Sequence, residues 1–264
     1  MRLTKALIPC GGRGTRMSSL TRGAAKELLP IAGVQLVLRV MQECAASGAR
    51  DVLIVSAPGK DDLNEAVRAA AGRPRMPESV HVVTQKDPRG LADAIRLGRD
   101  FVGSDTFGVA LPDNLFLGDE PALAQLFRVH ERTRKNVVAI VELTLADRAS
   151  YGPTAIYPGR LDGDEYVIES IPDKGRRDTT FNLKGAASAF TGVGRYVFLP
   201  EVFAAIDEVE ATLPSGKELD DIPVMQLLLG RGRLTGCPIG GDFLDVGLPS
   251  GYREANERLA RGES

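Results

Sequence analysis

A glycine- and arginine-rich segment near the N-terminus has the composition of an anion-binding loop. The segment, GGRGTR at residues 11–16, directly follows a short apolar run at residues 5–9. Glycines at the end of a strand let backbone N–H groups approach a phosphate closely, and guanidinium groups add bidentate donors. Lys26 supplies a further cation shortly after this segment. The pattern indicates a loop that binds nucleotide phosphates.

Two aspartates also follow apolar runs. Asp113 comes after residues 107–111, and Asp245 comes after Phe243 and Leu244. A carboxylate in this position loses hydration energy unless it meets a cation or hydrogen-bond donors. Taken singly, each is more simply explained as a turn or helix-capping residue. Together with the cationic loop they predict a Mg²⁺ site, because this ion prefers a few carboxylates combined with substrate phosphate oxygens and water.

Two familiar nucleotide-binding motifs do not describe this loop. A P-loop requires a lysine followed by Ser or Thr at a fixed offset, and none stands there. A dinucleotide-binding loop requires a third glycine where Met17 stands and an acid at the end of the second strand, where Ser56 stands. Neither a P-loop enzyme nor a nicotinamide-dependent oxidoreductase is therefore expected.

Composition excludes several other classes of protein. The 264 residues are 43% apolar and 26% charged, which is ordinary for a globular protein. Thirty-three basic and 35 acidic residues leave a net charge of −2, so there is no electrostatic reason to bind nucleic acid or an anionic membrane. Only two histidines and three unpaired-looking cysteines are present, which argues against histidine metal sites, catalytic triads and disulfides. No apolar run reaches the length of a membrane span or a signal peptide, so a cytoplasmic protein is expected.

Hydrophobic periodicity predicts alternating strands and helices. Short apolar runs of strand length lie at residues 5–9, 51–56, 80–84, 107–111 and 137–141. Helical spacing of apolar residues lies between them, with one helix opened by Gly33, and two further helices are expected near 200–208 and 219–229. This order predicts a largely parallel sheet covered by helices on both faces, with ligands bound beyond the carboxyl ends of the strands. We expect one domain over residues 1–264, with a ligand-specific lobe at about 150–200.

The sequence resembles the sugar-1-phosphate nucleotidyltransferases, particularly the glucose-1-phosphate uridylyltransferase branch. Two motifs carry the resemblance at the family's spacing: GGRGTR at residues 11–16 and KELLP at residues 26–30. Further family segments follow in order along nearly the whole chain: Gln85 to Ala94, Leu111 to Asn114, Tyr151-Gly152, Asp173-Lys174-Gly175, Thr191-Gly192, Gly194 to Tyr196, Asp245 to Gly247, and Gly251-Tyr252.

The resemblance implies a Rossmann-like α/β/α sandwich with a mixed, mostly parallel sheet. It also implies an enzyme that joins a nucleoside triphosphate to a sugar 1-phosphate with the help of Mg²⁺, giving a nucleoside diphosphate sugar and pyrophosphate. UTP is favoured over dTTP because Asp245 to Gly247 followed by Gly251-Tyr252 is closer to the uridylyl branch. The sequence leaves open whether the chain forms a homo-oligomer.

The resemblance also assigns roles to individual residues. Arg16 is expected at the triphosphate, Lys26 at the phosphates of the reacting centre, and Asp113 with Asp245 at Mg²⁺. The expected nucleotide-binding residues are Gly11, Gly12, Gly14, Thr15, Gln85 and Gly90. The expected sugar-phosphate-binding residues are Tyr151, Gly152, Asp173, Lys174 and Thr191.

Three alternatives remain at this point. A thymidylyltransferase of the same family would use dTTP. A catalytically silent sugar-nucleotide-binding module would keep the fold but lose a metal acid or the phosphate lysine, and both are present. A glycosyltransferase would show an Asp-x-Asp pair at a strand end, whereas Asp162 and Asp164 stand in a polar segment that looks like a hairpin tip.

His130 is expected to be a packed histidine, and Cys10 lacks a neighbour in sequence that would activate it.

Overall fold

A mixed sheet of nine strands forms the centre of the molecule. The computed structural model describes residues 3–12, 14–21, 23–144, 156–173 and 188–263. In sheet order the strands are β5 (Ser79–Thr84), β4 (Asp51–Ser56), β1 (Lys5–Pro9), β6 (Phe107–Ala110), β11 (Ser188–Phe198), β8 (Asn136–Thr144), β12 (Leu234–Pro238), β10 (Glu165–Ile168) and β9 (Gly159–Asp162).

The half of the sheet that contains β1, the strand before the glycine loop, is parallel. β5, β4, β1 and β6 run in the same direction, and β11 then runs antiparallel to both β6 and β8. β1, β4 and β6 are buried apolar runs, as expected of parallel strands covered on both faces. Their carboxyl ends lie at one edge, which is where such sheets bind ligands.

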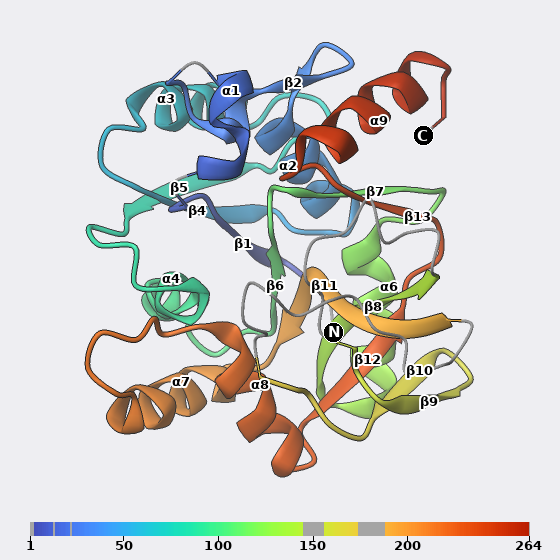
Figure 1. Cartoon of the computed structure of the whole chain (residues 1–264). Coiled ribbons are helices and arrows are strands. Elements are labelled where there is room, and N and C mark those ends of the chain that lie inside the picture. The colour runs from blue at the N-terminus through green and yellow to red at the C-terminus, as the bar shows by residue number, and fades with distance from the viewer. Residues whose placement is uncertain (1–2, 13, 22, 145–155, 174–187, 264) are drawn as a thin grey trace.

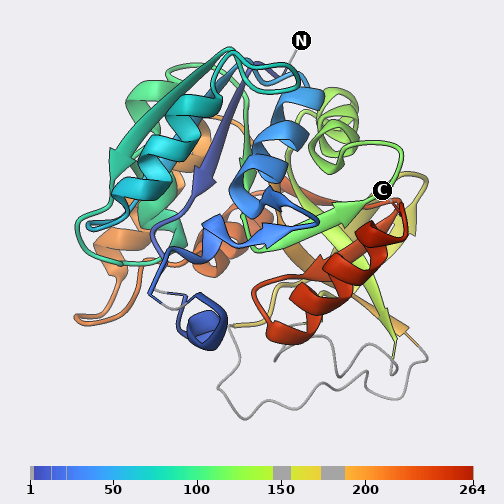
Figure 2. The same cartoon turned by 90° about the horizontal axis from the view of Figure 1, so that it is seen from above.

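Helices cover both faces of this sheet, and each face has its own apolar core (Figure 2). One face carries α2 (Leu36–Ala46), α3 (Asp61–Ala70) and α6 (Ala122–Thr133). The other face carries α4 (Leu91–Arg96), α5 (Arg99–Val102), α7 (Glu201–Thr212) and α8 (Asp221–Gly230). The predicted α/β/α sandwich with a mixed sheet is confirmed, as are helices near 200–208 and 219–229.

A separate two-stranded ribbon forms a third apolar cluster. β7 (Asn114–Leu117) pairs antiparallel with β13 (Asp242–Asp245), and α9 (Pro249–Ala260) packs beside them. Figure 1 shows α9 near β2 (Pro30–Ile31), on the side of the sheet where β7 and β13 lie. The ribbon brings residues that are far apart in sequence to the same place.

The segment after the glycine loop differs from the sequence prediction. It holds three short helices, η1 (Thr15–Met17), α1 (Ser18–Thr21) and η2 (Lys26–Leu28), followed by a hairpin of β2 and β3 (Val34–Gln35). The prediction that Gly33 opens a helix was wrong, because α2 begins at Leu36. Ala32 and Gly33 both have positive φ, which makes a tight hairpin turn and delays the helix.

Two smaller predictions are confirmed. Gly163 has a φ of 64° between β9 and β10, so Asp162 and Asp164 flank a hairpin tip rather than a ligand site. His130 is buried, and its Nδ1 lies 2.7 Å from the Lys135 carbonyl oxygen. Among the helices of the described ranges, none is long and apolar enough to cross a membrane.

Candidate active site

A cavity of about 720 Å³ opens at the carboxyl ends of β1, β5 and β6. It collects seven of the residues singled out from the sequence: Gly11, Gly12, Thr15, Lys26, Gln85, Gly90 and Asp113. The cavity is also lined by Tyr196, Glu218, Asp220 and Asp221. The cavity therefore combines the glycine loop, a cation and an acid from three separate parts of the chain.

The glycine loop lies against the side chains that follow it. Gly14 has a left-handed backbone (φ 62°, ψ 26°) that begins η1. A Cβ on Gly14 would stand 3.3 Å from the Lys26 side chain, and a Cβ on Gly11 would stand 2.5 Å from Gln85 Oε1. Glycine at both positions thus permits the close approach that a side chain would obstruct.

Lys26 and Asp113 form an ion pair at the cavity. Lys26 Nζ donates to Asp113 Oδ2 at 2.6 Å, and the two side chains are only 14% and 16% exposed. Burial opposes ionisation of both groups, but the attraction between them is stronger: the pKa of Asp113 is lowered and the pKa of Lys26 is raised. Both groups are therefore charged near neutral pH.

Asp245 reaches Asp113 through the β7–β13 ribbon. In that ribbon Asp245 pairs with Asn114, the residue after Asp113. A Cβ on Gly247 would stand 3.1 Å from both Asp113 Oδ2 and Asp245 Oδ1, so the two carboxylates border the same space. The sequence predicted two acids on one edge of the main sheet; the acids do converge, but Asp245 arrives from the separate ribbon.

The second carboxylate is held at an electrostatic cost. Burial and the charge of Asp113 raise the pKa of Asp245 to about 6, although Gly247 N–H donates to its Oδ1 at 3.1 Å. Two close carboxylates suit a hard dication such as Mg²⁺, which relieves their repulsion. No group of three or more His, Cys, Asp or Glu side chains able to hold a metal occurs among the described residues. The donor set therefore fits an ion that takes its remaining ligands from substrate phosphates and water.

We expect Asp245→Asn to stabilise the metal-free protein at pH 7.5, raising its melting temperature by about 2–6 °C. The pKa of Asp245 in the folded protein lies above its ordinary value, so folding at pH above 6 carries the cost of an unfavourable charge. As the pH falls below 6 the carboxyl takes up a proton and this cost disappears. Thermal unfolding in the presence of EDTA at pH 7.5 and at pH 4.5 measures the difference.

The matched control is Asp242→Asn at the other end of β13. Its side chain is 62% exposed and pairs with Arg258, so this variant should gain no stability. A melting temperature of Asp245→Asn equal to that of the parent at pH 7.5 would contradict the repulsion between Asp245 and Asp113.

Arg195 fixes the segment that carries Asp113. This fully buried guanidinium binds both carboxylate oxygens of Glu43, at 2.9 and 2.7 Å. It also donates to the carbonyl oxygens of Leu111 and Asn114, at 2.8 Å each. These two residues flank Asp113, so Arg195 holds the turn from both sides.

The remaining predicted site residues lie in different places. Arg16 in η1 is exposed, yet its charge affects the pKa of both Asp113 and Asp245, which places it near them. Thr191 is buried in β11, and Asp173 is exposed and accepts from Gln226 Nε2 at 3.0 Å. Neither is among the residues that line the cavity. Tyr151, Gly152 and Lys174 lie outside the described residues.

Sequence reasoning missed Lys60 and Glu27. Lys60 Nζ donates to the carbonyl oxygens of Cys10 and Gly12, at 2.6 and 3.0 Å, and to Glu27 Oε2 at 3.0 Å. Glu27 is fully buried in η2. Lys60 thereby ties down the carbonyl groups of the glycine loop and leaves its N–H groups for an anion. The sequence did contain one indication of this role, because Lys60 lies just beyond the carboxyl end of β4, at the same edge of the sheet as the loop.

The thiol of Cys10 is fully buried and is not among the groups that line the cavity. Burial, and secondarily the charge of Glu27, raises the pKa of its thiol well above the ordinary value. The interpretation of Cys10 as an unreactive residue agrees with this environment.

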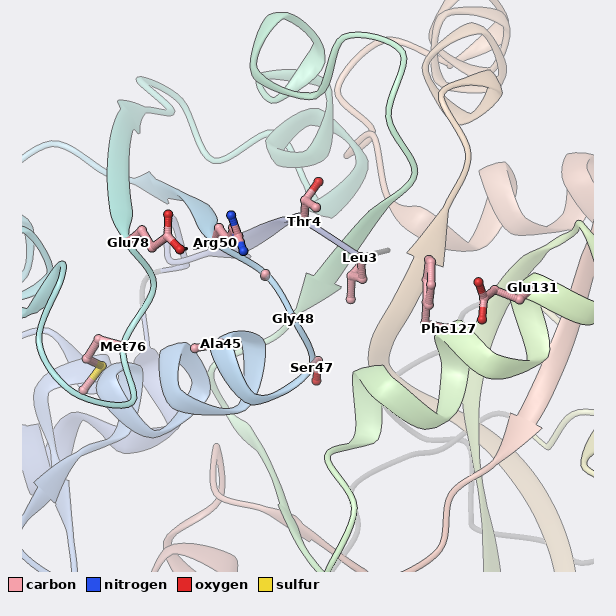
Figure 3. A pocket seen from close by; sticks show the side chains of 11 residues that line it. Leu3, Thr4, Ala45, Ser47, Gly48, Arg50, Met76, Glu78, Phe127 and Glu131 are labelled. Atoms are coloured by element: carbon pink, nitrogen blue, oxygen red, sulfur yellow. Dashed lines mark ion pairs between the residues drawn. The ribbon is translucent and has the colours of Figure 1, made fainter. Parts of the chain in front are cut away.

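A second cavity, of about 760 Å³, lies at the other end of β1 (Figure 3). Leu3 and Thr4, the turn after α2 and part of α6 line it. Arg50 and Glu78 pair with one another at 3.4 Å, and both are more than 60% exposed. This surface lacks the convergent buried charges of the first cavity.

Comparison with known proteins points to one family. The family described as nucleotidyl transferase matches residues 5–262. A UTP–glucose-1-phosphate uridylyltransferase of Bacillus subtilis is 27% identical over 95% of this chain and 89% of its own length. A UDP-glucose pyrophosphorylase solved with UDP-glucose superposes with a TM-score of 0.82, at 24% identity over 98% of this chain and 99% of its own. A UTP-bound enzyme of the same kind from Acinetobacter baumannii gives 0.78, at 19% identity over 97% and 93%.

Proposed function

The chain belongs to the nucleotidyl transferase family, and from this premise we propose that it transfers the uridylyl group of UTP to a sugar 1-phosphate. The products are a UDP-sugar and pyrophosphate. One observation carries the proposal: Lys26, Asp113 and Asp245 converge beside the glycine loop, at the edge of the sheet where ligands bind. The names of the Bacillus subtilis relative and of the two superposed structures favour UTP and glucose 1-phosphate as the substrates.

The proposed reaction requires no general base. An oxygen of the sugar phosphate attacks the α-phosphorus of UTP, and a new P–O bond forms there. The bond between the α-phosphorus and the oxygen that bridges to the β-phosphate breaks, and pyrophosphate leaves with that electron pair. Because a phosphate monoester is already anionic, the main barrier is the repulsion between two anions and the charge that builds on the transferred group.

Residues of the glycine loop and two cations lower this barrier in the proposal. The backbone N–H groups of Gly11, Gly12 and Thr15, with Arg16, bind the triphosphate. Lys26 contacts both the α-phosphate and the incoming sugar phosphate in this proposal. Its ion pair with Asp113 holds the ammonium in place before the substrates bind, so little reorganisation is required.

Asp113 and Asp245 would hold Mg²⁺ in this proposal. The ion, when bound, polarises a phosphoryl oxygen and offsets the charge of the leaving group. Asp113 would then share its carboxylate between Lys26 and the metal, and the charge of the ion would offset the repulsion that raises the pKa of Asp245. Arg195 keeps the turn of Asp113 rigid while these charges change.

Gln85 and Gly90 would bind the uracil base. Both line the cavity, and Gln85 is 94% buried. The residues that we propose to bind the sugar phosphate are Tyr151, Gly152, Asp173, Lys174 and Thr191.

We further propose that residues 1–264 act as one nucleotidyltransferase domain whose sugar-binding lobe lies at about 150–200. A cytoplasmic location is part of the proposal, supported by three buried cysteines that are all free thiols.

Pyrophosphate release tests the proposal. Purified protein with Mg²⁺ is offered UTP, dTTP, CTP, ATP or GTP in combination with glucose, galactose, mannose or N-acetylglucosamine 1-phosphate. UTP with glucose 1-phosphate should give the highest kcat/KM. Activity that is highest with dTTP would make the chain a thymidylyltransferase. Absence of pyrophosphate with every pair would leave a catalytically silent binding module.

A further inference from the structure

The amide of Gln85 is held in one orientation. Its Nε2 donates to Asp93 Oδ2 at 2.8 Å and to the Gly90 carbonyl oxygen at 3.2 Å. A carboxylate that bears no proton and a backbone carbonyl can only accept hydrogen bonds. Exchanging the nitrogen and oxygen of this amide would therefore set oxygen against oxygen at both contacts. The environment selects one of the two orientations that an amide can take.

Asp93 is itself fixed by arginines. The aspartate is 96% buried in the first turn of α4, and its Oδ1 accepts from Arg96 Nη2 at 2.7 Å. Arg89 Nη1 lies 3.7 Å from the same oxygen. These guanidinium groups hold Oδ1 of the carboxylate and leave Oδ2 directed to Gln85.

The oxygen of the Gln85 amide therefore faces the cavity beside the glycine loop. Oε1 of Gln85 points to Gly11, where a Cβ would stand only 2.5 Å from it. Gln85 and Gly11 both line the cavity. At this point the side chain can accept a hydrogen bond but cannot donate one.

An acceptor in this position distinguishes uracil from cytosine. Ring nitrogen N3 of uracil carries a proton and donates, whereas N3 of cytosine is an unprotonated acceptor. A buried acceptor that meets another acceptor is left without a partner, which weakens binding strongly. The distinction depends on the orientation of the amide, and hence on Asp93.

We propose that Asp93 is a positioning residue for base specificity, which orients Gln85 so that the cavity accepts a base with an N–H at the recognised position. The proposal rests on the proposed use of a uridine nucleotide and deepens it. Asp93 acts through Gln85 and touches no substrate itself.

Asp93→Asn tests the proposal with almost no change of shape. Arg96 requires an oxygen at the Oδ1 position, so the new amide nitrogen faces Gln85. In its present orientation the nitrogen of Gln85 then meets the nitrogen of Asn, whereas the exchanged orientation sets the oxygen of Gln85 against the Gly90 carbonyl oxygen. The preference for one orientation is lost, and in the exchanged one the nitrogen faces the cavity, where it would donate to N3 of cytosine. We expect the ratio of UTP affinity to CTP affinity, measured by calorimetry without sugar phosphate, to fall at least about tenfold.

Two controls separate this role from a merely structural one. Asp207→Asn on α7 also removes the charge of an aspartate that pairs with an arginine, Arg99. The Asp207 side chain is 49% exposed, and the ratio of this variant should equal that of the parent. Arg96→Met keeps the carboxylate of Asp93, so it should lower stability but preserve most of the discrimination. If Asp93→Asn does not fold, Asp93→Ala gives a second test, in which the freed amide should lower the ratio by a smaller factor.

The result that overturns the proposal is a ratio unchanged in both Asp93 variants, or a parent that binds UTP and CTP equally. Since binding is measured without turnover, this outcome is distinct from failure of the proposed function. A parent that prefers UTP but releases no pyrophosphate would refute the enzyme and leave the role of Asp93 to be decided by its variants.

Discussion

Asp113→Ala should lower kcat for pyrophosphate release from UTP and glucose 1-phosphate by at least about a thousandfold. The carboxylate contributes twice in the proposed site, as a ligand of Mg²⁺ and as the partner that holds Lys26 at 2.6 Å. Its removal leaves a half-buried lysine without its anion and the metal with a single protein carboxylate. Initial rates at saturating substrate, with Mg²⁺ varied from 0.1 to about 20 mM, measure the loss and show that added metal does not restore the rate.

Asp119→Ala is the matched control for this variant. Asp119 is exposed and lies just beyond β7, the strand that Asp113 precedes, so its removal should leave kcat within about twofold of the parent. Circular dichroism and thermal unfolding establish that both variants fold. An Asp113→Ala enzyme that retains near-full activity would remove this residue from the metal site.

Arg195→Met should destabilise the protein by about 3–5 kcal/mol, the largest stability effect that the structure suggests. The guanidinium is fully buried and satisfies both oxygens of Glu43 and three backbone carbonyl groups. Methionine has a similar length but leaves the Glu43 carboxylate without its cation, and the Glu43 side chain is only 14% exposed. Urea unfolding followed by circular dichroism gives the free energy of unfolding for parent and variant.

Two further variants test this explanation. Arg233→Met breaks the pair with Glu201, in which both side chains are more than a third exposed, and should lose less than about 1 kcal/mol. The double variant Glu43→Gln with Arg195→Met should recover part of the loss, because no unpaired buried charge remains. Equal effects of Arg195→Met and Arg233→Met would contradict the importance of the buried pair.

The sequence was sufficient to predict the parallel half of the sheet and the edge where the site lies. β1, β4 and β6 are short, continuous apolar runs bounded by Gly, Pro or Asp. Strands of this kind that alternate with helices usually form a parallel sheet covered by helices. The glycine loop could be recognised because its chemistry is local in sequence: the glycines and Lys26 lie within sixteen residues. The Ala32-Gly33 turn was missed because the apolar periodicity of the helix begins directly after it. The positive φ of these two residues makes a hairpin turn there, so the helix starts only at Leu36.

The path by which Asp245 reaches Asp113 could not be predicted from the sequence. It depends on the register of β13 against β7, which is set by packing with α9 and β2 in the third apolar cluster. Strand pairing between segments more than a hundred residues apart leaves no periodic signal in either segment.

The supporting residues were beyond prediction for a related reason. Lys60 and Arg195 each contact a residue distant in sequence, and Asp93 contacts Gln85 across the loop between β5 and α4. A charged residue is usually a solvated one. Only their burial in the fold distinguishes them from surface charges. The residues proposed to touch substrate were thus easier to find than the residues that position them.

In the proposed site, Asp113 and Asp245 hold one metal ion next to phosphates bound by the glycine loop, Arg16 and Lys26. Anomalous scattering from crystals grown with Mn²⁺ and UTP tests it most directly. We expect one manganese peak within coordination distance of both carboxylates and of the nucleotide phosphates, with Arg16 and Lys26 turned to those phosphates. A peak that neither aspartate contacts, or phosphates bound away from residues 11–16, would contradict it.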